Sequence, residues 1–288
     1  MYGPVVSSRA IPARYEAAGS RCHTRGAPKF RLAVVNGAKG AKGAKGYTGP
    51  MDLKESNLLG DGIARHWYYR AKAAAVQRLL RGRAPAAILD VGAGSGFFSR
   101  HLLTHTSANL AWCVDTGYDS DSQEEHQGKT LYFQRELSPV PADLILLMDV
   151  LEHVDDDAAL LRAALAASTA TDARILISVP AFQWLWSGHD DFLGHQRRYR
   201  LRQLTNLVTS AGLVIEQACY YYGLLFPLAV ATRLPARIQS RQPRSQLRAQ
   251  GPLTNRLLLA CCHAELPLLA HNRLAGLSAF CLARAGRG

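Results

Sequence analysis

Residues 89–97 read LDVGAGSGF, and they constrain the fold more than any other segment of the chain. A short apolar run, which includes Asp90, leads into three alternating glycines, Gly92, Gly94 and Gly96, and then into helix-like residues. Glycine has no Cβ, so the backbone can turn sharply and lie against a ligand, while the following helix offers free N–H groups at its N-terminus. The segment therefore predicts a strand, turn and helix that bind a nucleotide-type ligand.

Short apolar runs of strand length alternate with helix-like segments along most of the chain. The predicted strands are residues 86–91, 110–114, 144–148, 175–179, 213–219 and 277–283. The predicted helices are residues 66–80, 97–103, 156–167 and 201–211. This alternation is typical of an α/β fold in which a mostly parallel sheet is covered by helices on both faces.

The spacing of the glycines separates two classes of nucleotide-binding turn. A dinucleotide fold would have G-x-G-x-x-G, with its third glycine at position 97, but this position is Phe97. Asp115 follows the second predicted strand, where an acid can accept hydrogen bonds from both ribose hydroxyls of a nucleoside. The pattern predicts a nucleoside ligand and disfavours a dehydrogenase.

The glycine segment resembles motif I of the class I S-adenosylmethionine (SAM) dependent methyltransferases. Residues 148–154, MDVLEHV, resemble the segment after strand four in many small-molecule methyltransferases, and residues 179–199 resemble a bacterial subgroup of type 11/23. The resemblance covers residues 51–288 and implies a Rossmann-like sheet of seven strands, the last pair antiparallel, with S-adenosyl-L-methionine as cofactor. The cofactor-binding residues that it implies are Asp90, Gly92, Gly94, Gly96, Asp115, Glu136 and Asp149.

His189, His195 and Arg198 are the candidate catalytic residues. They follow the predicted strand at residues 175–179, so they belong to the carboxyl edge of the sheet, where ligands bind in such folds. Either histidine can act as a base for an oxygen acceptor, and Arg198 can clamp a phosphate or carboxylate. The alternative is an ion-paired network that fixes this loop, and the sequence leaves both open.

No metal site is predicted. Asp190 and Asp191 beside His189 resemble a ligand cluster, but nothing else in the chain offers a partner at a defined spacing. The six cysteines show no C-x-x-C spacing, which favours reduced thiols in a cytoplasmic protein.

The formal charge of +12 is concentrated at the two ends of the chain. The central segment, residues 51–234, is slightly acidic, whereas a nucleic-acid enzyme usually carries basic charge around its cleft. We therefore expect a small-molecule or lipid-linked acceptor, with a hydroxyl oxygen as the methylated atom. A nucleic-acid methyltransferase and a non-catalytic SAM-binding protein are the alternatives.

The chain divides into a basic tail, residues 1–50, and a methyltransferase domain, residues 51–288. The tail carries a repeated Gly-Ala-Lys run without helical or strand periodicity, so we expect it to be disordered. An insertion at about residues 220–272 precedes the last strand. Its segment 220–248 joins an uncharged stretch to several arginines, which suits peripheral contact with a membrane; the alternative is that its apolar residues pack onto the sheet.

Overall fold

The structure, a computed structural model, describes residues 60–236 and 251–286. The predicted tail and residues 237–248 of the basic link lie outside the described residues. Eight strands form one sheet in the order β3-β4-β2-β1-β5-β6-β8-β7. Their bounds are β1 (Ala87–Val91), β2 (Leu110–Val114), β3 (Ser122–His126), β4 (Lys129–Gln134), β5 (Leu144–Met148), β6 (Arg174–Pro180), β7 (Leu213–Tyr221) and β8 (Ser278–Ala285).

The Rossmann-like α/β fold is confirmed, but the expected strand number of seven is wrong. Neighbours from β4 to β6 pair in parallel, and β8 runs antiparallel to both β6 and β7. The additional strand is β3, which pairs antiparallel with β4 through a turn at Gln127 and Gly128. Both turn residues have positive φ, as a tight hairpin requires. β3 is polar and lies at the edge of the sheet, so no apolar run marks it.

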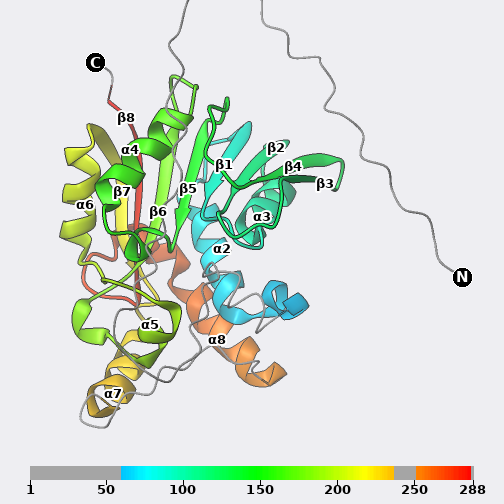
Figure 1. The fold of residues 1–288 in the computed structure, drawn as a ribbon. Helices are drawn as coiled ribbons and strands as arrows, with labels where there is room; N and C mark the ends of the chain where they lie inside the picture. The colour runs from blue at the N-terminus through cyan, green and yellow to red at the C-terminus, as the bar shows by residue number, and fades with distance from the viewer. Residues whose placement is uncertain (1–59, 237–250, 287–288) are drawn as a thin grey trace, which may run out of the picture.

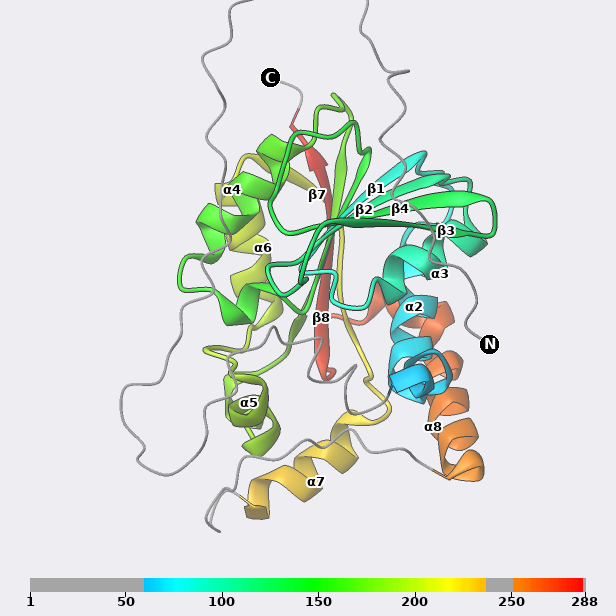
Figure 2. The same cartoon turned by 45° about the vertical axis from the view of Figure 1, so that its right-hand side comes forward.

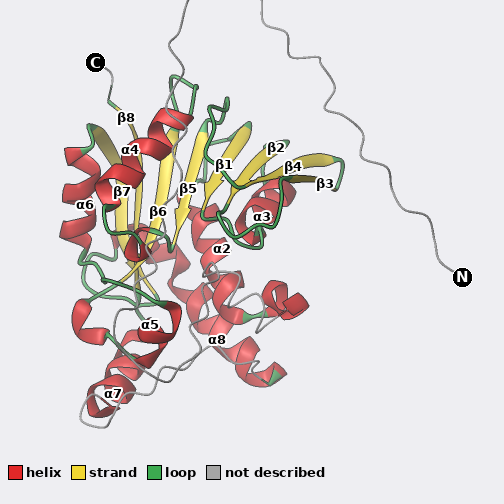
Figure 3. Cartoon of the chain, in the orientation of Figure 1, coloured by secondary structure: helices red, strands yellow, loops and turns green. Residues whose placement is uncertain are grey.

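Helices cover both faces of the sheet (Figures 1 and 3). On one face lie α2 (Trp67–Leu79), α3 (Phe97–His105) and α8 (Pro252–Glu265), and on the other α4 (Asp157–Ala167) and α6 (Leu201–Ser210). Successive strand side chains enter the two cores in turn: Leu89 faces α4 and α6, and Ile88 faces α2 and α3. Because both faces are buried, the central strands are continuous apolar runs.

Several short elements lie beyond the carboxyl ends of the parallel strands. Figure 2 shows α5 (Gly188–Leu193) and α7 (Phe226–Ala236) below this edge. The 3-10 turns η1 (Gly60–Arg65), η2 (Leu151–His153) and η3 (Gln183–Leu185) connect the same region. This end of the sheet is where an open α/β fold binds its ligands.

The predicted insertion consists of two parts with different surroundings. α8 and the following η4 (Leu266–His271) join the core beside α2, where Cys262 and Leu269 are buried. Leu224, before α7, is 58% exposed and Leu228, within it, is 61% exposed, so the alternative in which the apolar residues pack onto the sheet is wrong for these two leucines. Leu225 packs against the core on the α2 and α3 face, as that alternative expected. Among the helices described, none is both long and apolar enough to cross a bilayer.

Candidate active site

The glycine turn joins β1 to α3 with all three predicted glycines at positive φ: Gly92 at 73°, Gly94 at 51° and Gly96 at 71°. A Cβ on Gly92 would lie 2.6 Å from Cγ2 of Val150, so no side chain fits there. The Gly92 N–H donates to the carbonyl of Val114 at 2.7 Å, which fixes the turn against the end of β2. Sequence and packing therefore both require glycine at this turn.

Two acids predicted from the sequence lie at the turn. Asp115, directly after β2, accepts a hydrogen bond from Gly94 N–H at 3.0 Å on one oxygen and from Gly117 N–H at 2.9 Å on the other. Asp90 is buried and accepts a hydrogen bond from the Ser99 hydroxyl of α3 at 2.7 Å. Burial raises the pKa of Asp115 against these two hydrogen bonds, and it raises the pKa of Asp90 to about 7.

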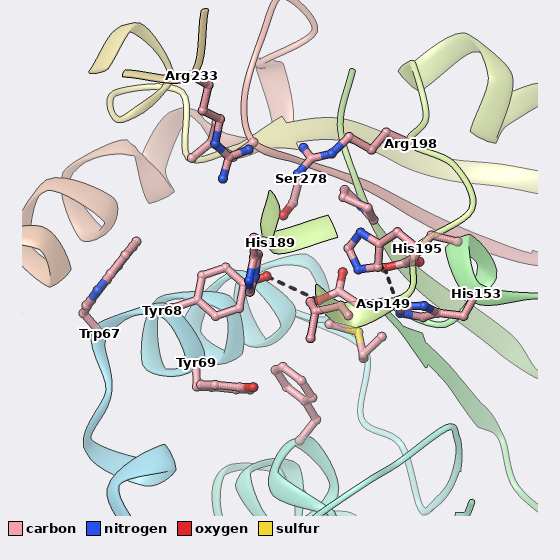
Figure 4. A pocket seen from close by; sticks show the side chains of 16 residues that line it. Trp67, Tyr68, Tyr69, Asp149, His153, His189, His195, Arg198, Arg233 and Ser278 are labelled. Carbon is pink, nitrogen blue, oxygen red and sulfur yellow. Dashed lines mark hydrogen bonds and ion pairs between the residues drawn. The ribbon is translucent and has the colours of Figure 1, made fainter. Parts of the chain in front are cut away.

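A cavity of about 270 Å³ opens beyond the end of β5, close to the start of α3 (Figure 4). It brings together the three candidate catalytic residues, His189, His195 and Arg198, with the predicted cofactor residue Asp149. Its wall is completed by Trp67, Tyr68, Tyr69, Phe98, Met148, Glu152, His153, Pro180, Leu193, Arg233, Leu277 and Ser278. Glu136, which follows β4 by two residues, is half-buried and does not line this cavity.

Asp149 directly follows the carboxyl end of β5 and has a left-handed backbone conformation, with φ of 58°. Its carboxylate forms an ion pair with Lys72 of α2 and accepts a hydrogen bond from the Ser178 hydroxyl at 3.1 Å. Burial favours the neutral amine of Lys72, but the charge of Asp149 outweighs this and raises the Lys72 pKa above its ordinary value. Asp149 is thus a fixed carboxylate at the edge of the cavity.

Asp190 of α5 organises the predicted catalytic residues. One of its oxygens accepts from Nε of Arg198 at 2.7 Å and lies 2.8 Å from Nδ1 of His195, while the other accepts from Nη2 of Arg198 at 2.9 Å. Burial works against the ionised carboxylate, but the His195 and Arg198 contacts outweigh it and lower the Asp190 pKa. The ion-paired network expected as an alternative is present, and the two residues that it fixes also line the cavity.

His189 and Arg197, two further basic residues of this loop, differ in position. His189 lines the cavity, and burial lowers its pKa to about 4. Arg197 is turned away from the cavity and pairs with Asp157 at 3.4 Å, so only one of the adjacent arginines faces the cavity.

A buried acid, Glu152, and a third histidine, His153, complete the polar wall. Glu152 is fully buried, and neither of its oxygens has a hydrogen-bond partner among the described residues. One oxygen lies 3.9 Å from Nε2 of His153 and 4.0 Å from Nε2 of His195. Burial raises the Glu152 pKa well above its ordinary value, and the neighbouring charge of Asp149 adds to this.

Sequence reasoning did not assign Lys72, Glu152, His153 or Arg233 to the site. Lys72 had a signal: it lies on the face of α2 that carries the buried Tyr69 and Val76, where a cation needs a buried partner. Arg233 comes from the insertion and had no such local signal. Burial, together with the like charge of Arg198, lowers the Arg233 pKa to about 10.

Comparison with known proteins identifies the family of this domain and supports its fold. Residues 64–218 match a family model described as a methyltransferase domain, of type 23. A protein described as a methyltransferase, in complex with the Haloferax volcanii Trm112 methyltransferase activator, is 14% identical at a TM-score of 0.50, and the match covers 82% of this chain and 95% of that one.

A second solved structure is phosphoethanolamine N-methyltransferase 2 of Haemonchus contortus in complex with SAM. It is 14% identical at a TM-score of 0.50, and the match covers 84% of this chain and 61% of that one. At this identity both structures support the fold alone. The search of curated proteins found no match. Because the family model spans more than half of the chain, the chain belongs to the type 23 family of class I SAM-dependent methyltransferases.

Proposed function

We propose that this enzyme transfers the methyl group of SAM to a hydroxyl oxygen of a small or lipid-linked acceptor bound in the cavity. The observation that carries the proposal is the position of the cavity. It opens at the end of β5 beside Asp149, and imidazole and guanidinium groups form its far wall (Figure 4).

The glycine turn fits the methyl donor. Gly92 packs directly against the Val150 side chain, which holds the turn at the end of β5, and the Ser95 hydroxyl is buried with no hydrogen-bond partner among the described residues. Asp115 would accept from the ribose hydroxyls, because each of its oxygens keeps a lone pair beyond its one backbone contact. Asp90, Gly94, Gly96, Glu136 and Asp149 would complete the donor site.

SAM supplies a methyl group on a sulfonium, which is already activated for in-line displacement, so the protein has to align the acceptor and exclude water. Aromatic side chains on α2 can enclose the apolar body of an acceptor, as Trp67 and Tyr68 line the cavity. Burial lowers the pKa of His189 to about 4, so it is neutral at pH 7 and can act as the base that takes the hydroxyl proton.

Two guanidinium groups favour an acceptor that also carries an anion. Arg198 and Arg233 both line the cavity, and each lowers the electrostatic cost of a phosphate or carboxylate there. Asp190 already neutralises Arg198. Arg233, which donates to the Leu185 carbonyl at 3.3 Å, adds a second guanidinium to the cavity wall.

Exposed leucines near the cavity support a lipid-linked acceptor. Leu224 and Leu228 belong to the α7 region, and Leu253 and Leu257, 80% and 63% exposed, to α8. Figure 2 shows both helices at the same end of the molecule as the cavity edge of the sheet. Apolar side chains beside arginines suit an element that rests at a membrane surface, where its apolar area enters the headgroup boundary.

The test is mass spectrometry of cell extracts incubated with the protein and SAM that carries a deuterated methyl group. We expect one small or lipid-linked compound to gain a trideuteromethyl group, and we expect less of it to be labelled by Asp115→Ala at the same SAM concentration. Label in RNA would overturn the acceptor class. Cofactor binding by calorimetry without any labelled product would show a non-catalytic SAM-binding protein.

A further inference from the structure

We propose that Glu152, His153 and His195 bind a divalent first-row transition-metal ion in the wall of the cavity. One carboxylate oxygen and two imidazole nitrogens, one from each residue, all lie within 4.8 Å of one another. The first two residues form part of η2 and the third follows α5, so the fold brings together ligands that are 42 residues apart in sequence. This metal site is a feature additional to methyl transfer, and whether it binds an ion does not depend on the proposed reaction.

The carboxylate is the strongest argument for a ligand at this point. Glu152 is completely buried, and its two oxygens have no hydrogen-bond donor among the described residues. An acid in such a position is costly unless something compensates for the lost hydration. The Nε2 atoms of His153 and His195 lie 3.9 and 4.0 Å from one of its oxygens, which is too far for a hydrogen bond. A cation between these three atoms would satisfy the carboxylate.

His195 is oriented as a metal ligand requires. Its Nδ1 lies 2.8 Å from Asp190, and this contact holds Nε2 toward Glu152. A metal-bound histidine usually donates its other N–H to a carboxylate in the same way, which fixes the ring and its tautomer. Figure 4 shows the rings of His153 and His195 close together beside Asp149.

The backbone also holds the two ligand segments together. Gln196, next to His195, donates its N–H to the Glu152 carbonyl at 2.8 Å and its side-chain amide to the His153 carbonyl at 2.9 Å. Ligand atoms around a tetrahedral ion with bonds of about 2.0–2.1 Å lie about 3.3 Å apart, so binding needs a contraction of about 1 Å. Rotation of the Glu152 and His153 side chains would have to supply this change, because Asp190 holds the His195 ring.

The donor set indicates the class of ion. Two imidazoles and one carboxylate suit Zn²⁺, Fe²⁺, Mn²⁺ or Co²⁺, whereas Mg²⁺ and Ca²⁺ prefer oxygen ligands alone. Three protein ligands leave positions open on the cavity side, where an acceptor hydroxyl can bind.

The role in catalysis rests on the proposed function. Coordination would lower the pKa of the acceptor hydroxyl, its proton would leave to His189, and the oxygen would attack the methyl group as the carbon–sulfur bond breaks onto sulfur. The ion is neither oxidised nor reduced. Because the lone pair of His195 is then used for coordination, His189 is the remaining base among the two predicted histidines.

The experiment is a titration of the chelator-treated full chain with Co²⁺, followed by its visible absorption, and with Zn²⁺ by calorimetry. We expect one ion per chain and absorption bands of cobalt bound to nitrogen and oxygen ligands. Glu152→Gln and His195→Gln should each weaken binding by tenfold to a hundredfold or more. His189→Gln, which changes a histidine of the same cavity outside the ligand set, should leave the affinity unchanged.

Retained SAM binding in each variant shows that it is folded. Equal Co²⁺ affinity in the wild-type chain and in the Glu152→Gln and His195→Gln variants would overturn the metal site, as would loss of binding in His189→Gln. Metal binding without methyl transfer to any acceptor would keep the site and overturn the proposed reaction. Methyl transfer by a chain that binds no metal would support the proposed reaction and overturn the metal site.

Discussion

Lys72, in the middle of α2, forms an ion pair with Asp149 at the end of β5, and its side chain is completely buried. Lys72 also donates to the hydroxyl of Tyr68 at 2.8 Å, one turn earlier in the same helix. These contacts join α2 to the carboxyl edge of the sheet at the cavity. The ion pair therefore links the stability of α2 to the geometry of the proposed active site.

Removal of Lys72 should destabilise the protein more than removal of the whole pair. Lys72→Met leaves the Asp149 carboxylate without its cation, and we expect unfolding in urea to show a loss of about 3 kcal/mol. The Asp149 side chain is 29% exposed, so water partly compensates for the lost cation and the loss of stability should not exceed this value.

The double variant Lys72→Met/Asp149→Asn is the control for this experiment. Asparagine tolerates the left-handed backbone of position 149, and it removes the unpaired charge, so part of the stability should return. If the effects of Lys72→Met alone and of Asp149→Asn alone add up to the effect of the double variant, the two residues are not coupled.

Gly92→Ala should reduce SAM affinity by tenfold or more, because the new Cβ would lie 2.6 Å from Val150 and the turn would have to move. Gly82→Ala is a matched control: Gly82 also has positive φ, at 78°, but its Cβ would meet nothing within 4 Å. Both alanines carry a backbone cost of about 1–2 kcal/mol, so the difference between them reports the clash. Calorimetry that shows equal affinities would exclude a role for close packing in cofactor binding.

Asp115→Ala should lower SAM affinity by about tenfold to a hundredfold, which corresponds to the loss of one or two good hydrogen bonds. The control is Asp119→Ala, since Asp119 is an exposed acid close to the same turn. Unchanged affinity in calorimetry would remove Asp115 from the cofactor site.

The sequence was informative wherever function depends on local geometry. The glycine turn and the position of Asp115 beside it could be predicted because a turn between a strand and a helix needs particular residues at a particular spacing. The role of these residues in SAM binding stays a prediction. His189, His195 and Arg198 could be placed in one site because the carboxyl ends of parallel strands meet at one edge, and the structure brings them together.

Features that depend on long-range pairing could not be predicted. β3 consists of Ser, Gln, Glu and His residues, and only its hairpin with β4 makes it a strand. Glu152 and His153 are adjacent in the chain, but the third member of their cluster, His195, is brought beside them by the fold of the loop around α5. No spacing pattern links them, which is why the absence of a metal site was expected from the sequence.

The pKa of Asp90 predicts how stability changes with pH. Burial raises this pKa from 3.8 to about 7, so the stability that the neutral acid contributes is complete below pH 4 and is lost as the pH rises through 7. Asp90→Asn stays neutral, and its free energy of unfolding relative to wild type should rise between pH 4 and pH 8 by up to about 4 kcal/mol. Urea unfolding at several pH values measures this difference. A pH-independent difference would show that Asp90 is ionised throughout.

The exposed leucines of the α7 and α8 region form the proposed membrane contact. If this surface rests on a membrane, the full chain should sediment with anionic lipid vesicles at low salt. Substitution of three of these leucines by serine should weaken binding by about a hundredfold, at roughly 1 kcal/mol for each half-inserted side chain. The three substitutions are Leu224→Ser, Leu228→Ser and Leu257→Ser.

Val214→Ser provides the matched control for the vesicle experiment. Val214 is 44% exposed, but it lies at the start of β7, at the end of the sheet opposite the cavity. Its substitution should leave vesicle binding unchanged, because this end does not face the proposed membrane surface. If the wild-type chain stays in the supernatant, or if Val214→Ser weakens binding as much as the triple variant, the surface is not a membrane contact.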